Sequence, residues 1–344
     1  MFKPRRYFYW FILGICAAIF IMACGRSRDP STSNSSTPAN SESCRLVKHE
    51  MGETEVCGQP QKVAALSPHI LDSILALGVQ PTGYAESREL NIKTYDNPAE
   101  QIPYIGQWVT TQPIGVGDRK SPSLERLAQL QPDLILGEEW NNKDEYSLLT
   151  QIAPTLLFSD TKNPNEPQSW QQDIQGIAKA LGREAKAEEL LTTHNKQITQ
   201  ARKALQPVLQ KYPRVFLISS NLTTQIYSQP ESTTARLLKE IGFEIVQPED
   251  AKGEAEISQE ILPQIKTDLV IVLSYSDDSF NNWEDTVRQK WAQNPLLNSM
   301  LVFQSGRVFF VDYYLWGGHT RGPLSDCLIL EALPDLLLSS VEDS

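Results

Sequence analysis

Short runs of consecutive apolar residues alternate along the chain with longer segments in which apolar residues recur every three or four positions. The short runs predict buried strands and the longer segments predict amphipathic helices. Their alternation is typical of parallel α/β sheets. The predicted strands form two groups, at residues 63–66, 82–85, 134–136 and 155–158, and at residues 215–219, 244–246, 269–273 and 308–311.

Residues 168–210, between the two groups, are rich in Ala, Glu, Lys, Leu and Gln and contain no proline before Pro207. This composition favours helix, and Gly182 predicts a break within it. We therefore expect an α/β fold of two Rossmann-like lobes, at residues 44–167 and 211–344, joined by one long connecting helix.

One sequence pattern occurs in both lobes. Ser123-Leu124-Glu125 is followed by Asp133-Leu134, and Ser258-Gln259-Glu260 is followed at the same spacing by Asp268-Leu269. Each serine fits a helix N-cap with a glutamate in the first turn, near the positive end of the helix dipole. Alternatively, the two carboxylates form matched docking points for basic residues of a two-fold symmetric partner. The spacing leaves both interpretations open.

The N-terminus has the residue order of a secretory signal, with basic residues before an apolar run at residues 7–23. The run ends in Ile21-Met22-Ala23-Cys24-Gly25, which resembles a bacterial lipobox in which Cys24 is lipidated. A single transmembrane anchor is the alternative, because about 17 apolar residues are at the lower limit for crossing a bilayer. We expect a lipoprotein signal peptide at residues 1–23 and, from its polar composition, a disordered tether at residues 24–43.

The formal net charge of −11 argues against nucleic acid as a partner and against electrostatic docking on anionic lipid. It does not exclude an anionic ligand, because exposed charges are screened beyond about 10 Å. Export permits disulfides, and Cys44 and Cys57 bracket a short predicted hairpin, so we expect a disulfide there; two free thiols are the alternative. Cys327 lies in an apolar periodicity and is expected in the core.

Several short motifs follow one another in a fixed order: Lys62-Val63-Ala64-Ala65-Leu66, Leu77-Gly78-Val79-Gln80-Pro81, Gln131-Pro132-Asp133-Leu134-Ile135, Gln151-Ile152-Ala153-Pro154-Thr155 and, near the C-terminus, Trp316. Together they resemble the periplasmic binding proteins of iron-siderophore and cobalamin ABC importers, from about residue 44 to residue 338. The resemblance implies the class III fold, with a rigid helix between two lobes that close little on a ligand. It also implies that Glu125 and Glu260, one from each lobe, meet arginines on a permease dimer driven by a cytoplasmic ATPase.

The expected ligand is a ferric siderophore, with cobalamin and haem as alternatives within the same family and with no resident cofactor. Such a chelate is bulky, often anionic and partly apolar, so its site needs aromatic walls and arginines, and the protein forms no bond to the metal. Side chains after strand ends and in the insertion from about residue 86 to 120 are the candidates. They are Arg88, Trp108, Arg119, Trp140, Tyr227, Tyr275, Trp316 and Arg321, and each is also compatible with an ordinary core or surface position.

Direct metal binding by the protein is not expected. A transition-metal carrier needs about three histidines and a carboxylate at one centre. His49, His69, His194 and His319 are scattered over both lobes and the connecting helix. We expect His194 on an exposed helix face, and Arg236 at the surface.

Catalysis is not expected either, because no nucleophile elbow, Walker loop or zinc-protease helix occurs in the sequence. The nearest grouping for an exported hydrolase is Ser67, His69 and Asp72, which fits better as a strand-end loop that begins a helix. The sequence therefore predicts a monomeric binding protein that is lipid-anchored on the periplasmic side of a bacterial membrane.

Overall fold

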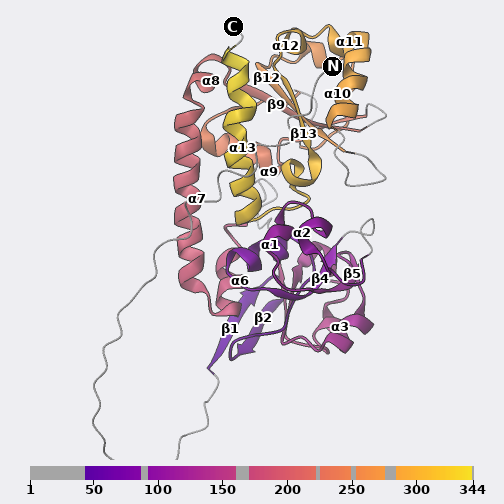
Figure 1. Cartoon of the computed structure of the whole chain (residues 1–344), viewed down its shortest axis with the longest axis vertical. Helices are drawn as coiled ribbons and strands as arrows, with labels where there is room; N and C mark the ends of the chain where they lie inside the picture. The colour runs from indigo at the N-terminus through magenta and orange to yellow at the C-terminus, as the bar shows by residue number, and fades with distance from the viewer. Residues whose placement is uncertain are drawn as a thin grey trace, which may run out of the picture. The chain divides into compact units, whose positions relative to one another are not determined.

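The computed structural model of the chain describes residues 43–86, 92–159, 170–221, 225–248, 253–275 and 284–342 (Figure 1). The predicted signal peptide, Cys24 and nearly all of the predicted tether lie outside these residues, as does Arg88. Within the described ranges, no helix combines the length and the apolar character needed to cross a membrane.

The first lobe is built on a six-stranded sheet with the strand order β6-β5-β4-β3-β7-β8. All neighbouring strands are parallel except β6, which is antiparallel to β5. The four predicted strands are all present as β4, β3, β7 and β8, which lie side by side from the centre of the sheet to one of its edges. The strands are β3 (Val63–Ala65), β4 (Pro81–Glu86), β5 (Ile114–Asp118), β6 (Ser121–Pro122), β7 (Leu134–Glu138) and β8 (Thr155–Phe158).

The second lobe contains a five-stranded sheet in which β10, β9, β12 and β13 follow one another and β11 also pairs with β9. Only β10 is antiparallel to its neighbour. All four predicted strands are confirmed, and β10 is the one that the sequence pattern did not predict. The strands are β9 (Arg214–Ser220), β10 (Ile226–Ser228), β11 (Glu244–Ile245), β12 (Leu269–Ser274) and β13 (Val308–Asp312).

A long helix runs between the two lobes (Figure 1). The helical segment is divided into α6 (Ile174–Leu181), α7 (Glu184–Ala204) and α8 (Gln206–Lys211). The break between α6 and α7 lies at Gly182, whose φ of 64° is the left-handed conformation that glycine adopts at helix C-termini. Helix α7 has 21 residues and therefore spans about 31 Å. It packs along α13 (Pro323–Glu342), whose first turns also contact the first lobe.

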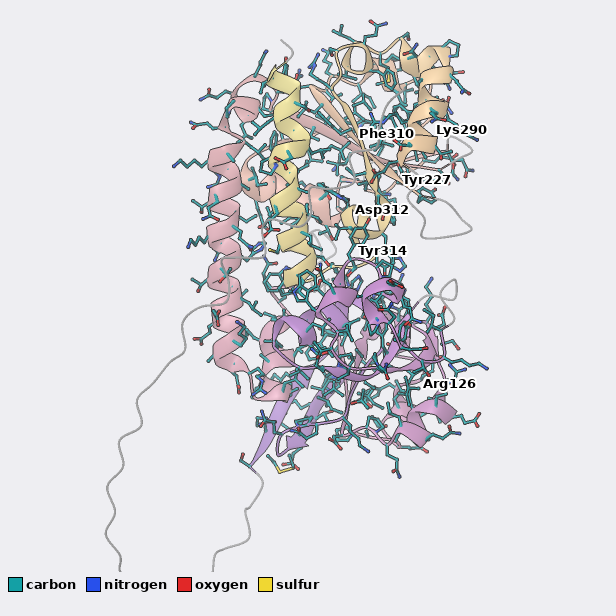
Figure 2. The ribbon with its side chains drawn as sticks, in the orientation of Figure 1. Arg126, Tyr227, Lys290, Phe310, Asp312 and Tyr314 are labelled. Carbon is teal, nitrogen blue, oxygen red and sulfur yellow. A yellow bond between two sulfur atoms is a disulfide. The ribbon has the colours of Figure 1, made fainter. Side chains whose placement is uncertain are left out.

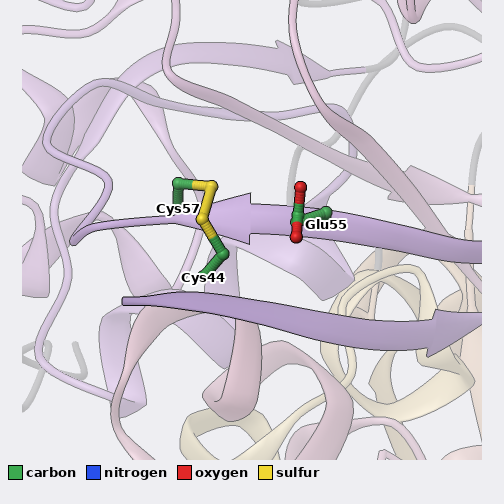
Figure 3. A group of neighbouring side chains, drawn as sticks. All are labelled: Cys44, Glu55 and Cys57. Atoms are coloured by element: carbon green, nitrogen blue, oxygen red, sulfur yellow. A yellow bond between two sulfur atoms is a disulfide. The ribbon is translucent and has the colours of Figure 1, made fainter. Parts of the chain in front are cut away.

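An N-terminal hairpin of β1 (Cys44–His49) and β2 (Gly52–Cys57) lies against α6. Cys44 and Cys57 are opposite one another in the register and are joined by a disulfide (Figure 3). Glu55 lies close to both sulfur atoms, a grouping that could suggest a metal site. Because the sulfurs are bonded to each other, neither is a thiolate that could bind a metal.

The repeated Ser-x-Glu pattern begins an α-helix in the first lobe only. Ser123 Oγ accepts a hydrogen bond of 3.3 Å from the Arg126 amide at the start of α3 (Leu124–Leu130). Ser258 instead heads a turn that leads into a short 3₁₀ helix, η3 (Leu262–Gln264). The predicted second helix is wrong because Pro263 takes the place of Ala128 and lacks the N–H that an α-helix requires.

Helices cover both faces of each sheet, so the central strands are buried throughout. The remaining elements of the first lobe are α1 (Pro68–Ala76), α2 (Pro98–Gln101), η2 (Ile105–Trp108), α4 (Glu139–Asn142) and α5 (Tyr146–Leu149). Those of the second lobe are α9 (Thr233–Ile241), α10 (Glu284–Gln293), α11 (Pro295–Asn298), α12 (Leu301–Gln304) and the π-helical turn η4 (Tyr314–Gly318).

Candidate ligand-binding site

An open cavity of about 330 Å³ lies between residues of the two lobes. The first lobe contributes side chains that follow β5 and β7, and the second lobe contributes the segment after β13 together with the loop before α9. Ligands of parallel α/β folds bind beyond the carboxyl ends of the strands. The volume also falls within the range of roughly 300–1,000 Å³ that is usual for small-molecule sites.

A cationic and aromatic surface forms the first-lobe wall. The guanidinium of Arg119 lies 5.6 Å from the centre of the Trp140 ring, and Lys120 Nζ lies 6.0 Å from it. The loop is held by the Arg119 amide, which donates to Glu86 O, and by Asn142 Nδ2, which donates to Arg119 O, both at 2.8 Å. Trp140 is 47% exposed, so its ring is available to stack against a ligand.

The second-lobe wall carries carboxylates and a phenol. Glu231, Glu254 and Tyr313 line the cavity, and Tyr275 packs on Tyr313 with ring centres 5.6 Å apart. Burial raises the pKa of Tyr313, and the negative charge of Glu254 raises it further. The Tyr313 hydroxyl therefore stays protonated and can donate a hydrogen bond to a bound molecule.

Beside the cavity, Glu138 forms a buried cross-lobe contact. Arg321 Nη2 donates to Glu138 Oε1 at 3.0 Å, and His69 Nδ1 hydrogen-bonds the same oxygen. Asn141 Nδ2 donates to the other oxygen at 2.8 Å. Burial alone would raise the pKa of Glu138, but His69 and Arg321 outweigh it and hold that pKa well below its ordinary range. Glu138 and Arg321 therefore form an ion pair that links β7 to the second lobe.

A second buried carboxylate, that of Glu86 at the end of β4, also has partners in both lobes. It accepts hydrogen bonds from the hydroxyls of Tyr84 and Tyr314, the latter at 2.8 Å, and His319 Nε2 lies 3.4 Å from its other oxygen. Tyr314 projects from the second lobe toward the first (Figure 2). Tyr104 stacks on Tyr314 and donates to Asp312.

Asp72 on α1 makes a third contact between the lobes. Its carboxylate accepts hydrogen bonds from the amides of Leu324 and Ser325, both at 2.9 Å, and from Ser325 Oγ at 2.5 Å. Burial raises the pKa of Asp72 to about 7, against the effect of these donors. The first lobe thus supplies the side chain that caps the first turn of α13.

A family model described as a periplasmic binding protein matches residues 63–315 of the chain. The chain belongs to the periplasmic binding protein family. The matched segment includes the sheets of both lobes. It also includes all the residues that line the cavity except Gly317, Gly318, His319 and Arg321.

Relatives and solved structures agree with this assignment. The binding protein is 27% identical to a putative ABC transporter substrate-binding lipoprotein of Bacillus subtilis, with 83% of this chain and 86% of the relative covered. It is 26% identical to the Fe(3+)-citrate-binding protein of the same organism, with 88% of each chain covered. Staphylococcus aureus SirA complexed with staphyloferrin B superposes with a TM-score of 0.70 at 22% identity, over 86% of this chain and 98% of SirA, which shows the shared fold.

The structure places three of the predicted ligand residues on the cavity wall of the binding protein. These are Arg119, Trp140 and Arg321, although Arg321 is also paired with Glu138. Tyr275 does not line the cavity, but its ring contacts that of Tyr313, which does. The ligand roles of all the predicted residues remain predictions.

Three other predicted ligand residues do not line this cavity. Trp108 packs against the first-lobe core, and Tyr227 lies on β10. Trp316 is 7% exposed and belongs to the second-lobe core, where its carbonyl accepts a hydrogen bond from Thr234. Glu231 and Glu254 also line the cavity; the sequence did not predict them because an anionic chelate favours arginines and aromatic residues, and a glutamate is ordinarily a surface residue.

Two residues predicted at the surface are buried instead. Arg236 is 5% exposed and His194 is 3% exposed. Arg236 donates to Glu240 Oε1 at 2.8 Å and to Asp326 Oδ2 at 2.5 Å, while His194 Nε2 lies 3.1 Å from the other oxygen of Glu240. The predictions are wrong because α7, α9 and α13 pack together, which buries His194 of α7 and Arg236 of α9 beside Glu240 and Asp326.

The cysteine and the two docking candidates differ in accessibility. Cys327 is half-buried rather than fully buried, and burial raises the pKa of its thiol to about 11, so it is a poor nucleophile.

Glu125, in the first turn of α3, and Glu260, in the turn before η3, are both exposed. Each lobe therefore presents one of these carboxylates to solvent.

Proposed function

We propose that this periplasmic binding protein captures a ferric siderophore between its lobes and delivers it, unchanged, to an ABC permease. The observation that carries the proposal is the cavity wall formed by Arg119 and the exposed ring of Trp140. An arginine beside an aromatic face suits a bulky chelate that is anionic and partly apolar. The names of the relatives support iron chelates as the class of ligand.

In this proposal the iron arrives as cargo within its chelate, and the protein supplies neither a resident cofactor nor a catalytic group. Glu125 and Glu260 dock on basic residues of a two-fold symmetric permease, whose cytoplasmic ATPase drives uptake. Lipidation of Cys24 holds the monomeric protein on the periplasmic side of the membrane. The exposure of both carboxylates, one from each lobe, supports the docking step.

Fluorescence titration of the mature soluble protein tests the ligand assignment. We expect saturable tryptophan quenching by ferric chelates from a panel of ferric hydroxamates, ferric citrate, haem and cobalamin. Trp140→Phe should remove much of the quenching, whereas Trp108→Phe, a matched change outside the cavity, should not. Saturable quenching by cobalamin alone would overturn the assignment to iron.

Charge reversal tests the docking step separately. In the Glu125→Lys/Glu260→Lys variant we expect uptake of radiolabelled iron chelate to collapse while the dissociation constant of the isolated protein stays unchanged. Glu188→Lys, an exposed charge reversal on α7, is the control and should support normal uptake. A loss of ligand affinity in the double variant would place these carboxylates in the pocket instead.

A further inference from the structure

The two walls of the cavity carry opposite charge. Arg119 lies on the first-lobe wall, with Lys120 beside the same tryptophan ring. On the second-lobe wall are Glu231 and Glu254, which are both exposed. No basic side chain among the described residues forms an ion pair with either of these carboxylates. The cavity is thus cationic on one side and anionic on the other.

The position of Glu254 is fixed by a buried side chain. Gln229 is 5% exposed, and its Nε2 donates to Glu254 Oε1 at 2.7 Å and lies 3.2 Å from Ser219 Oγ. Because the buried Gln229 amide holds the Glu254 carboxylate at the cavity edge, the Glu254 side chain loses less conformational entropy when it contacts a ligand. Glu254 is therefore a preorganised acceptor and not a freely rotating surface group.

Arg321 does not neutralise the anionic wall, because it pairs with the buried carboxylate of Glu138 at 3.0 Å. A ligand that fills the cavity displaces the water that solvates Glu231 and Glu254. Removing water from a carboxylate without supplying a donor or a positive charge is unfavourable. A purely anionic chelate meets this cost, whereas a chelate with a cationic group avoids it.

We infer that the chelate class suited to this cavity carries a protonated amine in addition to its anionic iron-binding groups. The anionic part faces Arg119 and Trp140, and the ammonium group faces Glu231 and Glu254. This inference rests on the proposed function and adds to it the distribution of charge on the ligand.

A matched pair of chelates tests the inference on the full mature protein. The probes are a ferric trihydroxamate with a free primary amine, the same chelate with that amine acetylated, and ferric citrate as a purely anionic probe. We expect the free-amine form to bind about 10-fold or more tightly than the acetylated form, as for a hydrogen bond to a charged group. Glu231→Gln/Glu254→Gln should abolish this ratio without weakening the binding of ferric citrate.

Glu256→Gln is the control variant, since Glu256 is an exposed neighbour that does not line the cavity, and it should keep the preference for the amine. Equal binding of the two trihydroxamates by the wild type overturns the inference and leaves the proposed function standing. The same conclusion follows if only ferric citrate binds, or if the double variant keeps the preference. If none of the ferric chelates binds, the proposed function fails and this inference fails with it.

Discussion

Two sets of charged residues lie between the lobes, and they differ in burial. Glu138 and Arg321, which are 2% and 7% exposed, are paired with each other across the interface. Arg119 and Glu254, a short distance along the same interface, line an open cavity and form no ion pair with a described residue. Both sets contain an arginine from one lobe and a glutamate from the other. Residue type therefore does not distinguish a charge that joins the lobes from one that faces a ligand.

Similar substitutions in the two sets should therefore have different consequences. Removing a buried, paired charge leaves its partner without a counter-charge in a poorly solvated place, so the fold should lose stability. Removing a cavity charge leaves no buried charge without its partner in the ligand-free protein. Ligand affinity should therefore change, and the free energy of unfolding should change little.

Glu138→Gln should lower the free energy of unfolding by about 3–5 kcal/mol, because Arg321 stays buried without its counter-charge. Denaturant unfolding followed by circular dichroism measures this difference. Glu139→Gln is the matched control, since Glu139 forms only a surface pair with Lys143 at 3.4 Å. That change should cost at most about 1 kcal/mol. Equal losses in the two variants would contradict the assignment of Glu138 to the interface.

Tyr314→Phe should cost about 2 kcal/mol, because it removes one of the hydroxyl donors to the buried carboxylate of Glu86. The same unfolding measurement applies. Tyr146→Phe, at a half-buried tyrosine of α5, serves as the comparison and should have little effect. A loss in Tyr314→Phe no larger than in the control would show that Glu86 does not depend on this cross-lobe donor.

Acid should weaken the buried contact through Glu138. The folded-state pKa of Glu138 is depressed, so its contribution is present above the unfolded value of about 4.3 and is lost as pH falls below it. The free energy of unfolding should then fall by up to about 1.4 kcal/mol per pH unit through this one group. The difference in free energy of unfolding between the wild type and Glu138→Gln, measured from pH 7 to pH 3, should narrow toward the acid end. A constant difference between them would refute the assigned shift.

Arg119→Ala should change the free energy of unfolding by no more than about 1 kcal/mol, because Arg119 is only half-buried and forms no ion pair with a described residue. Its effect should appear in ligand affinity, with a loss of about 10-fold or more for an anionic ferric chelate, measured by fluorescence titration. Arg183→Ala, at the start of α7, should change neither quantity. Destabilisation comparable to that of Glu138→Gln would place Arg119 in the interface set.

Much of the fold could be predicted because its signals are local. Strands such as β8 and β12 are continuous apolar runs, as parallel strands covered on both faces must be. Strand β5 was missed because its sequence, Ile-Gly-Val-Gly-Asp, has two glycines and no such run. The second Ser-x-Glu helix was predicted from a repeat, and one proline, Pro263, was enough to prevent it.

The sequence by itself determined the central strands with continuous apolar runs, the division into two sheets and the helix break at Gly182, because each depends on residues close together in the chain. Tertiary structure alone decided which charges are buried. Arg321 meets Glu138 across 183 positions and Arg236 meets Asp326 across 90, separations that no local pattern reports. The burial of a charged side chain depends on a partner that supplies the opposite charge, and that partner is known only once the chain has folded.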